Sequence, residues 1–187
     1  PPILAASGVD FVGIDLEHST ISLDEARQII AAAEGAGTAC FPRIASHNGE
    51  QIRRLLDVGA GGIIVPNVES EDQVRQIVAW MKYPPEGRRS FGVAPAQGYG
   101  FDFREYAAGW NDAGVLLLQI ESVQGVDQAD RLLSHPAVDG LMVGPYDISG
   151  SLGIPGELAH PRVAEACAQV LEVCRRNPHE AQRCAVV

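Results

Sequence analysis

Residues 55–70 read LLDVGAGGIIVPNVES, and this stretch decides the fold class of the chain. Its first residues complete a helix that ends at Gly59, since glycine commonly stands just past a helix end. Gly61–Val65 is a short, continuously apolar strand, and Pro66 ends it because proline cannot donate to a strand ladder. A second helix is expected over residues 70–81. An apolar strand between two helices is typical of a parallel sheet that is covered on both faces.

The same alternation of strands and helices extends over most of the chain. Further strands are expected at residues 11–15, 39–44, 115–120 and 138–143, although Pro42 is unusual inside a strand. Further helices are expected at residues 22–35, 48–58, 103–111, 125–134 and 161–176. Residues 83–99 and 149–160 are expected to be loops. This order predicts βαβ units in an α/β protein.

Two α/β architectures fit this order: an open doubly wound sheet and a (β/α)8 TIM barrel. No GxGxxG or phosphate-binding loop follows the first strand, which weakens the case for a nucleotide-binding open sheet. A complete barrel has eight strands in about 250 residues. Residues 183–187 (RCAVV) resemble a sixth strand cut short. We therefore expect a single partial barrel domain over residues 1–187, without its first strand and its final strands.

Composition excludes several classes of protein. The formal net charge is −10 and 46% of residues are hydrophobic, which argues for a packed core and against a nucleic-acid binder. No stretch is apolar enough to cross a membrane, and the start of the chain does not resemble a signal peptide. The four cysteines form no CxxC pair, so we expect reduced thiols and a cytoplasmic protein.

Polar side chains repeatedly follow the expected strands at their carboxyl ends. The residues that share this position are Asp15, Glu17, His18, Arg43, Asn67, Gln119, Glu121 and Asp147. In α/β folds the functional site is built at this edge of the sheet. Five strands that contribute to one edge therefore predict a site there.

Glu121 and Asp147 are the candidate metal ligands. Two carboxylates, completed by water and substrate oxygens, suit Mg²⁺ or Mn²⁺. The alternative is that Glu121 caps a helix and that Asp147 has a capping or turn role.

His18, Arg43 and Asp57 are the candidate catalytic residues. Histidine titrates near neutral pH and is suited to act as a base, although a loop histidine can also simply bind backbone. Arg43 would hold a carboxylate or an enolate, or else form a structural ion pair. Asp57 lies in the last turn of a helix, where the dipole disfavours a carboxylate. It would pair with Arg53 or Arg54, or assist a histidine.

The single lysine of the chain restricts the chemistry. Lys82 follows a helix and precedes Tyr83, so it is a poor candidate for a Schiff base, which requires a lysine at a strand end. Carbanion chemistry would then require a metal. The loop at residues 84–92, with Arg88 and Arg89, is either a solvated connection or an anion site.

These residues carry a resemblance to a known family. The chain resembles the HpcH/HpaI aldolases, metal-dependent pyruvate aldolases related to citrate lyase β chains, from about residue 9 to residue 176. The resemblance rests on the motifs IDLEH (14–18), FPRI (41–44), LLDVGAGGIIVPNVES (55–70), YPPEGRRS (83–90), LLQIES (117–122) and VDGLMVGPYDISGSLG (138–153).

The resemblance implies a fold, an assembly and roles for single residues. It implies a (β/α)8 barrel in a homo-hexamer of dimers that exchange their last helix. Glu121 and Asp147 would bind Mg²⁺ or Mn²⁺, with Co²⁺ or Zn²⁺ as further options. His18 would be the base, Asp57 would raise its basicity, and Arg43 would stabilise the enolate. The keto acid would contact Gln119, the backbone near Tyr146, and Asp147.

The activity implied is cleavage of a 4-hydroxy-2-oxo acid to pyruvate and an aldehyde. Two rival activities share the fold: an acyl-CoA lyase of the malyl or citryl type, and an oxaloacetate decarboxylase. A third possibility is a truncated, inactive barrel subunit without enzymatic activity. The partners expected are a small keto acid and an aldehyde, with neither nucleic acid nor a membrane.

Overall fold

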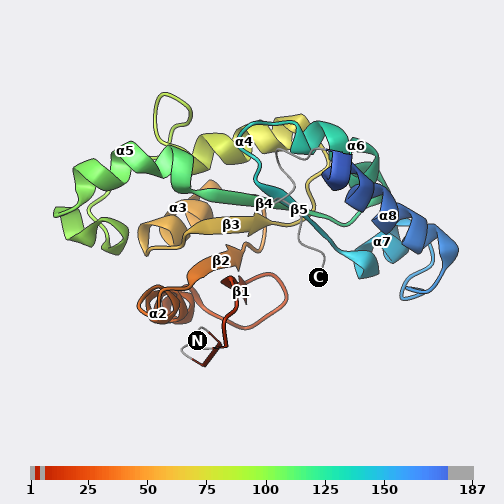
Figure 1. Cartoon of the computed structure of the whole chain (residues 1–187), viewed down its shortest axis with the longest axis horizontal. Helices are drawn as coiled ribbons and strands as arrows, with labels where there is room; N and C mark the ends of the chain where they lie inside the picture. Colours follow the sequence, from red (N-terminus) through yellow and green to blue (C-terminus); the bar gives the residue numbers. More distant parts are fainter. Residues whose placement is uncertain (1–2, 5–6, 177–187) are drawn as a thin grey trace. The chain divides into compact units, whose positions relative to one another are not determined.

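A computed structural model describes residues 3–4 and 7–176 of the chain. The described part divides into two compact units, each of which is presented separately. One unit consists of the described residues up to 64 together with residues 77–115, and the other of residues 65–76 and 116–176. In both units the strands pair in parallel and alternate with helices along the chain, which confirms an α/β fold (Figure 1).

The first unit contains three parallel strands in chain order, β1 (Phe11–Asp15), β2 (Ala39–Arg43) and β3 (Gly62–Val65). β1 and β2 pair over five successive positions, from Phe11 opposite Ala39 to Asp15 opposite Arg43. The strand expected around Pro42 is therefore confirmed. The backbone groups of Cys40 and Ile44 form hydrogen bonds towards β3, one with Gly61 and one with Ile64. Pro42 lies midway between these two residues, so its backbone edge also faces β3. Its missing N–H shortens the ladder there, and one register pair, Arg43 opposite Ile64, joins β2 to β3.

Helices α2 (Leu23–Glu34) and α3 (Gly49–Asp57) connect these strands. α2 begins with the expected capping box, in which Ser22 and Glu25 bond to each other's backbone N–H groups. α2 packs on β1, β2 and α3 through its buried face. The rest of this unit comprises the end of α4 (Glu71–Met81), a 3₁₀ segment η1 (Pro95–Gly100) and α5 (Phe103–Ala113).

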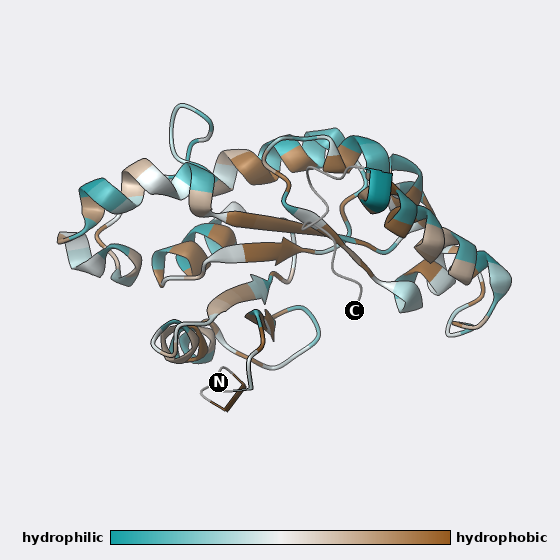
Figure 2. Cartoon of the chain, in the orientation of Figure 1, coloured by the Kyte–Doolittle hydropathy of each residue, from teal (hydrophilic) through white to brown (hydrophobic). Residues whose placement is uncertain are grey.

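The second unit contains the parallel pair β4 (Val115–Ile120) and β5 (Gly140–Val143). Leu118 and Ile120 of β4 are fully buried, and Figure 2 shows β4 in the brown of hydrophobic residues. Helices α6 (Val123–Leu133), α7 (Pro145–Ser151) and α8 (Pro161–Arg176) complete the unit. α8 packs on α6, α7 and β5.

Two short elements differ from the sequence-based expectation. η1 lies in a stretch that was expected to be loop, and Gly98 and Tyr99 inside it have left-handed φ values of 57° and 54°. α7 begins at Pro145, before the loop that was expected from Ser149. At seven residues, α7 is too short to show a hydrophobic period, but a proline at its first position is a helix-start signal.

Three further expectations have different outcomes. The sixth strand was expected at residues 183–187, which lie outside the described residues, so the count of eight barrel strands stays a prediction. The expectation of a single domain over residues 1–187 also stays a prediction. Cys40 and Cys167 carry free thiols, whereas Cys174 is disulfide-bonded, so the expectation of reduced thiols is wrong for Cys174. Within the described ranges, every helix is too short or too polar to span a lipid bilayer.

Replacement of a core residue tests the packing of the first unit. Ile63 in β3 is 0% exposed, so Ile63→Ala should lower the free energy of unfolding by about 2–5 kcal/mol, through lost burial and the cavity left behind. Urea unfolding measures this change. Val93→Ala, at a side chain that is 75% exposed, is the control and should change stability by less than about 0.5 kcal/mol. Equal effects of the two substitutions would contradict the assigned burial.

Candidate active site

The carboxyl ends of β1 and β2 carry an arginine held by two carboxylates. The Nε and one terminal nitrogen of Arg43 donate to the two oxygens of Asp15 at 2.9 and 2.7 Å, a bidentate ion pair. A second terminal nitrogen lies 3.3 Å from Glu17 Oε2. Because Asp15 and Arg43 are opposite each other in the parallel register, the strands themselves align this pair. The guanidinium is therefore fixed in position.

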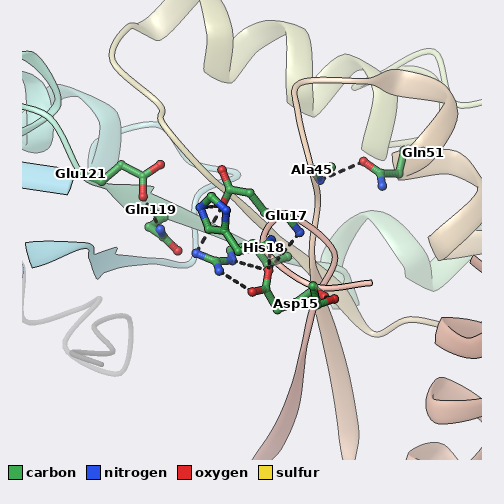
Figure 3. A network of polar contacts seen from close by, with 9 residues as sticks. Asp15, Glu17, His18, Ala45, Gln51, Gln119 and Glu121 are labelled. Carbon is green, nitrogen blue, oxygen red and sulfur yellow. Dashed lines mark hydrogen bonds and ion pairs between the residues drawn. The ribbon is translucent and has the colours of Figure 1, made fainter. Parts of the chain in front are cut away.

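Asp15 is held strongly in its charged form. The hydrogen bond from Arg43 lowers the pKa of Asp15 from 3.8 to about 2, partly opposed by burial, with further lowering by the backbone N–H groups of Glu17 and His18. These N–H groups donate to Asp15 Oδ1 at 3.0 and 3.3 Å (Figure 3). The same carboxylate thus fixes both the arginine and the turn that carries His18.

His18 lies in this turn with its imidazole mostly in solvent. Its side chain is 68% exposed, and its Nε2 is 3.9 Å from Glu17 Oε2. The structure therefore places His18, Arg43 and the acids Asp15 and Glu17 at one strand edge (Figure 3). An accessible imidazole beside a carboxylate is suited to exchange protons with a bound molecule.

Asp57 has a partner that neither sequence-based alternative named. It is the last residue of α3, as expected, but its Oδ1 accepts a hydrogen bond from Arg89 at 2.7 Å. Arg54 pairs instead with Glu50, one helical turn away. The alternative in which Asp57 pairs with Arg53 or Arg54 on its own helix is therefore wrong, and its assistance to His18 stays a prediction.

Arg89 is enclosed by aromatic rings, and its side chain is 0% exposed. Its guanidinium carbon lies 4.7 Å from the ring centre of Tyr83 and 4.8 Å from that of Trp110. Stacking against ring faces and the pair with Asp57 together offset the loss of solvation. The sequence signal for this arrangement was the doublet Arg88-Arg89. The doublet alone does not indicate which carboxylate pairs with Arg89.

Lys82 is buried at the end of α5, where its ammonium serves as a cap. Its Nζ donates to the backbone carbonyls of Asn111 and Gly114, the latter at 3.3 Å. A cation at a helix carboxyl end is stabilised by the helix dipole. This amine is already engaged by carbonyl oxygens, which agrees with the prediction that it is a poor Schiff-base nucleophile.

In the second unit, Gln119 and Glu121 come together at the end of β4. Glu121 is only 8% exposed, and Gln119 Nε2 donates to its Oε2 (Figure 3). The neighbouring strand ends at Val143, opposite Ile120, so Gly144 lies beside Glu121. A Cβ on Gly144 would be 2.8 Å from Glu121 Cβ and 3.0 Å from Oε2, which leaves no room for a larger residue. Only glycine fits beside this carboxylate.

Ser122, and not Glu121, is the residue that caps helix α6. Its hydroxyl caps α6 by accepting from Gly125 N at 3.0 Å, and it also donates to Glu69. Because Ser122 is the cap, the carboxylate of Glu121 is not used as one.

Asp147 and Tyr146 lie in the first turn of α7, directly after β5. Both are exposed, and neither side chain has a described hydrogen-bond partner. This turn is held in place by Ser149, whose hydroxyl donates to the Tyr146 carbonyl and accepts from Gly156 N at 2.8 Å. β4 and β5 are adjacent, so Glu121 and Asp147 follow neighbouring strand ends of one unit.

The donor set in this unit suits a hard divalent cation. Among the described residues, no three or more Asp, Glu, His or Cys side chains form a metal-binding group. Mg²⁺ and Mn²⁺ need no such group, since one or two carboxylates with water and substrate oxygens are sufficient. A buried glutamate, oriented by an amide and confined by a glycine, together with an exposed aspartate in the helical turn after the next strand, therefore fits such an ion.

The chain matches the family model described as HpcH/HpaI aldolase/citrate lyase over residues 2–182. The chain belongs to this family. A 5-keto-4-deoxy-D-glucarate aldolase of Escherichia coli is 33% identical over 168 residues, which are 90% of this chain and 66% of the aldolase. The chain thus spans slightly less than two thirds of the length of that relative.

Solved structures of HpcH/HpaI proteins have the same fold. An HpcH/HpaI aldolase from Desulfitobacterium hafniense is 33% identical, with a TM-score of 0.86 over 94% of this chain and 68% of that one. The citrate synthase SbnG is 30% identical, with a TM-score of 0.85 over 100% of this chain and 71% of that one. The resemblance expected from the sequence motifs is therefore confirmed.

The Asp15–Arg43 pair predicts a specific acid sensitivity. The folded pKa of Asp15 is below its ordinary value, so the stabilisation is complete above about pH 4 and is lost as pH falls towards 2. Asp15→Asn should cost about 1 kcal/mol at neutral pH, a value reduced for the partial exposure of the pair. It should also flatten the loss of stability between pH 4 and 2, as measured by urea unfolding at several pH values.

Asp10→Asn, at an exposed residue with no partner in the described part of the chain, is the matched control. It should leave the acid dependence of the wild type unchanged. If the wild type and Asp15→Asn lose stability in parallel between pH 4 and 2, the pair does not stabilise the fold as described.

Proposed function

We propose that this protein is a metal-dependent aldolase that cleaves a 4-hydroxy-2-oxo acid to pyruvate and an aldehyde. The observation that carries the proposal is the position of Glu121 and Asp147 after two adjacent strands, in a member of the HpcH/HpaI family. The aldolase name of the Escherichia coli relative supports the same reaction class.

Glu121 and Asp147 would hold the divalent metal, Mg²⁺ or Mn²⁺. When bound, the metal supplies electrostatic stabilisation of negative charge on the oxygens of the 2-oxo acid. Gln119 orients the Glu121 carboxylate through its amide N–H. The exposed first turn of α7, with Tyr146 and Asp147, would contact the keto-acid end of the substrate.

His18 would be the base. It removes the proton of the 4-hydroxyl group, and the C3–C4 bond breaks as the new carbonyl of the aldehyde forms. The electron pair of that bond passes to the three-carbon fragment as the enolate of pyruvate, and a proton delivered to C3 completes the reaction. The imidazole of His18 is 68% exposed, so solvent can reach it between turnovers.

Arg43 would stabilise the enolate oxygen. Its guanidinium is fixed by Asp15 before any substrate arrives, so little reorganisation is needed when charge develops. Asp15 is therefore a positioning residue, and its strongly lowered pKa keeps it charged throughout the working pH range. Asp57 is proposed to raise the basicity of His18.

Removal of the carboxylates tests the metal assignment. Glu121→Ala and Asp147→Ala should each lower the rate of aldol cleavage by roughly 100-fold or more, because a metal ligand is lost. They should also lower Mn²⁺ affinity in calorimetric titration. Full activity of either variant with added Mn²⁺ or Mg²⁺ would rule out that residue as a ligand.

Gly144→Ala tests the same site without removing a ligand. The added methyl group would displace the Glu121 carboxylate, so Mn²⁺ affinity should fall about 10-fold or more while the fold is retained. Gly150→Ala in α7, where a Cβ meets nothing within 4 Å, is the matched control and should bind Mn²⁺ like the wild type. Identical affinities of both variants would refute the steric argument.

A second candidate activity is the decarboxylation of oxaloacetate to pyruvate. The similarity to the citrate synthase SbnG supports carbon–carbon chemistry other than aldol cleavage on this fold. Both activities share a 2-oxo-acid enolate. Deuterium exchange into the methyl group of pyruvate tests for this step, and its absence would favour an inactive barrel subunit. Oxaloacetate decarboxylation, or binding of coenzyme A, would favour the rival lyase activities.

The remaining expectations are also proposals. We infer that the barrel has eight strands, that the protein assembles into a homo-hexamer, and that it works in the cytoplasm. The first two are what the resemblance of the sequence motifs to the HpcH/HpaI family implies.

A further inference from the structure

A polar cavity lies in the first unit, and its lining does not include Arg43 or His18. It has a volume of about 270 Å³, and its lining comes from the start of α3, the end of α4 and the loop that follows. The lining residues are Gly49, Glu50, Arg53, Trp80, Arg88, Arg89 and Ser90. Neither the proposed metal ligands nor the proposed base take part in it.

Positive charge dominates this lining, in a chain whose net charge is −10. Three arginines line the cavity against one glutamate, Glu50, which is itself paired with Arg54 at 2.7 Å. Within the described residues, the side chains of Arg53 and Arg88 form no ion pair or hydrogen bond. Their charges are therefore available to a bound anion.

Arg89 stands in the wall of this cavity with its guanidinium buried. Its side chain is 0% exposed, and its Nε–H is buried without a hydrogen-bond partner in the described part of the chain. Asp57 accepts from one terminal nitrogen and the Tyr106 hydroxyl lies 3.4 Å from the other, so the five N–H donors of this guanidinium are only partly matched by acceptors. A partly matched guanidinium in the cavity wall favours an anion nearby.

The wall of the cavity is rigid. A Cβ on Gly49 would come within 2.7 Å of the Trp80 ring, so the start of α3 rests directly on the indole. The loop is held by Arg88 N, which donates to Ala79 O at 2.7 Å, and by Arg89 N, which donates to Lys82 O at 2.9 Å. The arginines therefore project from fixed backbone, as expected of a preorganised binding site.

We propose that this cavity binds the phosphate group of a small ligand, either free phosphate or the terminal phosphate of a nucleotide. Guanidinium groups match phosphate oxygens in bidentate geometry, and a dianion complements the excess of positive charge. The amino end of α3 adds the positive end of a helix dipole, and Ser90 adds a hydroxyl donor.

Phosphate titration of the full chain tests this proposal. At constant ionic strength, inorganic phosphate should bind saturably, as followed by calorimetry and by the fluorescence of Trp80, which lines the cavity. Arg53→Gln and Arg88→Gln should each weaken binding about 10-fold or more, because each removes a charged donor. Glu50→Gln should strengthen binding, since it removes the one carboxylate of the lining.

Arg104→Gln is the matched control, because Arg104 is an exposed residue of α5 outside the lining and its loss changes the net charge equally. It should bind phosphate within about twofold of the wild type. ADP as a second probe distinguishes the sources: tighter binding than phosphate indicates a nucleotide. The proposal is overturned if neither probe saturates, or if Arg104→Gln weakens binding as much as Arg53→Gln.

Discussion

Parallel pairing in register is the constraint on which both groups of site residues depend. In the first unit it places Arg43 directly opposite Asp15, so the two strand ends meet as a bidentate ion pair. In the second unit it aligns Ile120 with Val143, so Glu121 comes to lie against Gly144. A shift of one residue in either pairing would turn these side chains to the opposite face of the sheet. The geometry of the site therefore follows from the backbone ladders.

Each cation in the interior of the first unit is compensated in a different way. Arg43 is held by carboxylates, Arg89 by Asp57 and aromatic rings, and Lys82 by backbone carbonyls. Three solutions are needed because a buried charge without partners is strongly unfavourable. The compensation has a geometric consequence, since it fixes the guanidinium of Arg43 in position and engages the amine of Lys82 with carbonyl oxygens. The Nε–H of Arg89 is left without a hydrogen-bond partner among the described residues.

Much of the fold and part of the candidate site could be predicted from the sequence. Strands such as Val115–Ile120 are continuous apolar runs, and the acids and amides that follow them are visible as strand-end residues. α7 could not be predicted from periodicity because seven residues are too few for a helical pattern. The partner of Asp57 was missed for another reason: Arg89 is 32 residues away, whereas Arg53 and Arg54 are close in sequence. Residues that are close in sequence are the first candidates for an ion pair, but in the folded protein Asp57 pairs with a residue that is distant in sequence.

The sequence by itself determined the order of strands and helices, the family, and the residue types at each strand end, because apolar runs and their polar ends are local patterns. Only the tertiary structure decided which charges meet. It assigned Asp15 and Glu17 to Arg43, Arg89 to Asp57, and Gly144 as the residue that leaves space for Glu121. The physical reason is that an ion pair or a steric limit depends on the distance between side chains from separate elements, and that distance exists only after the strands have paired and the loops have packed.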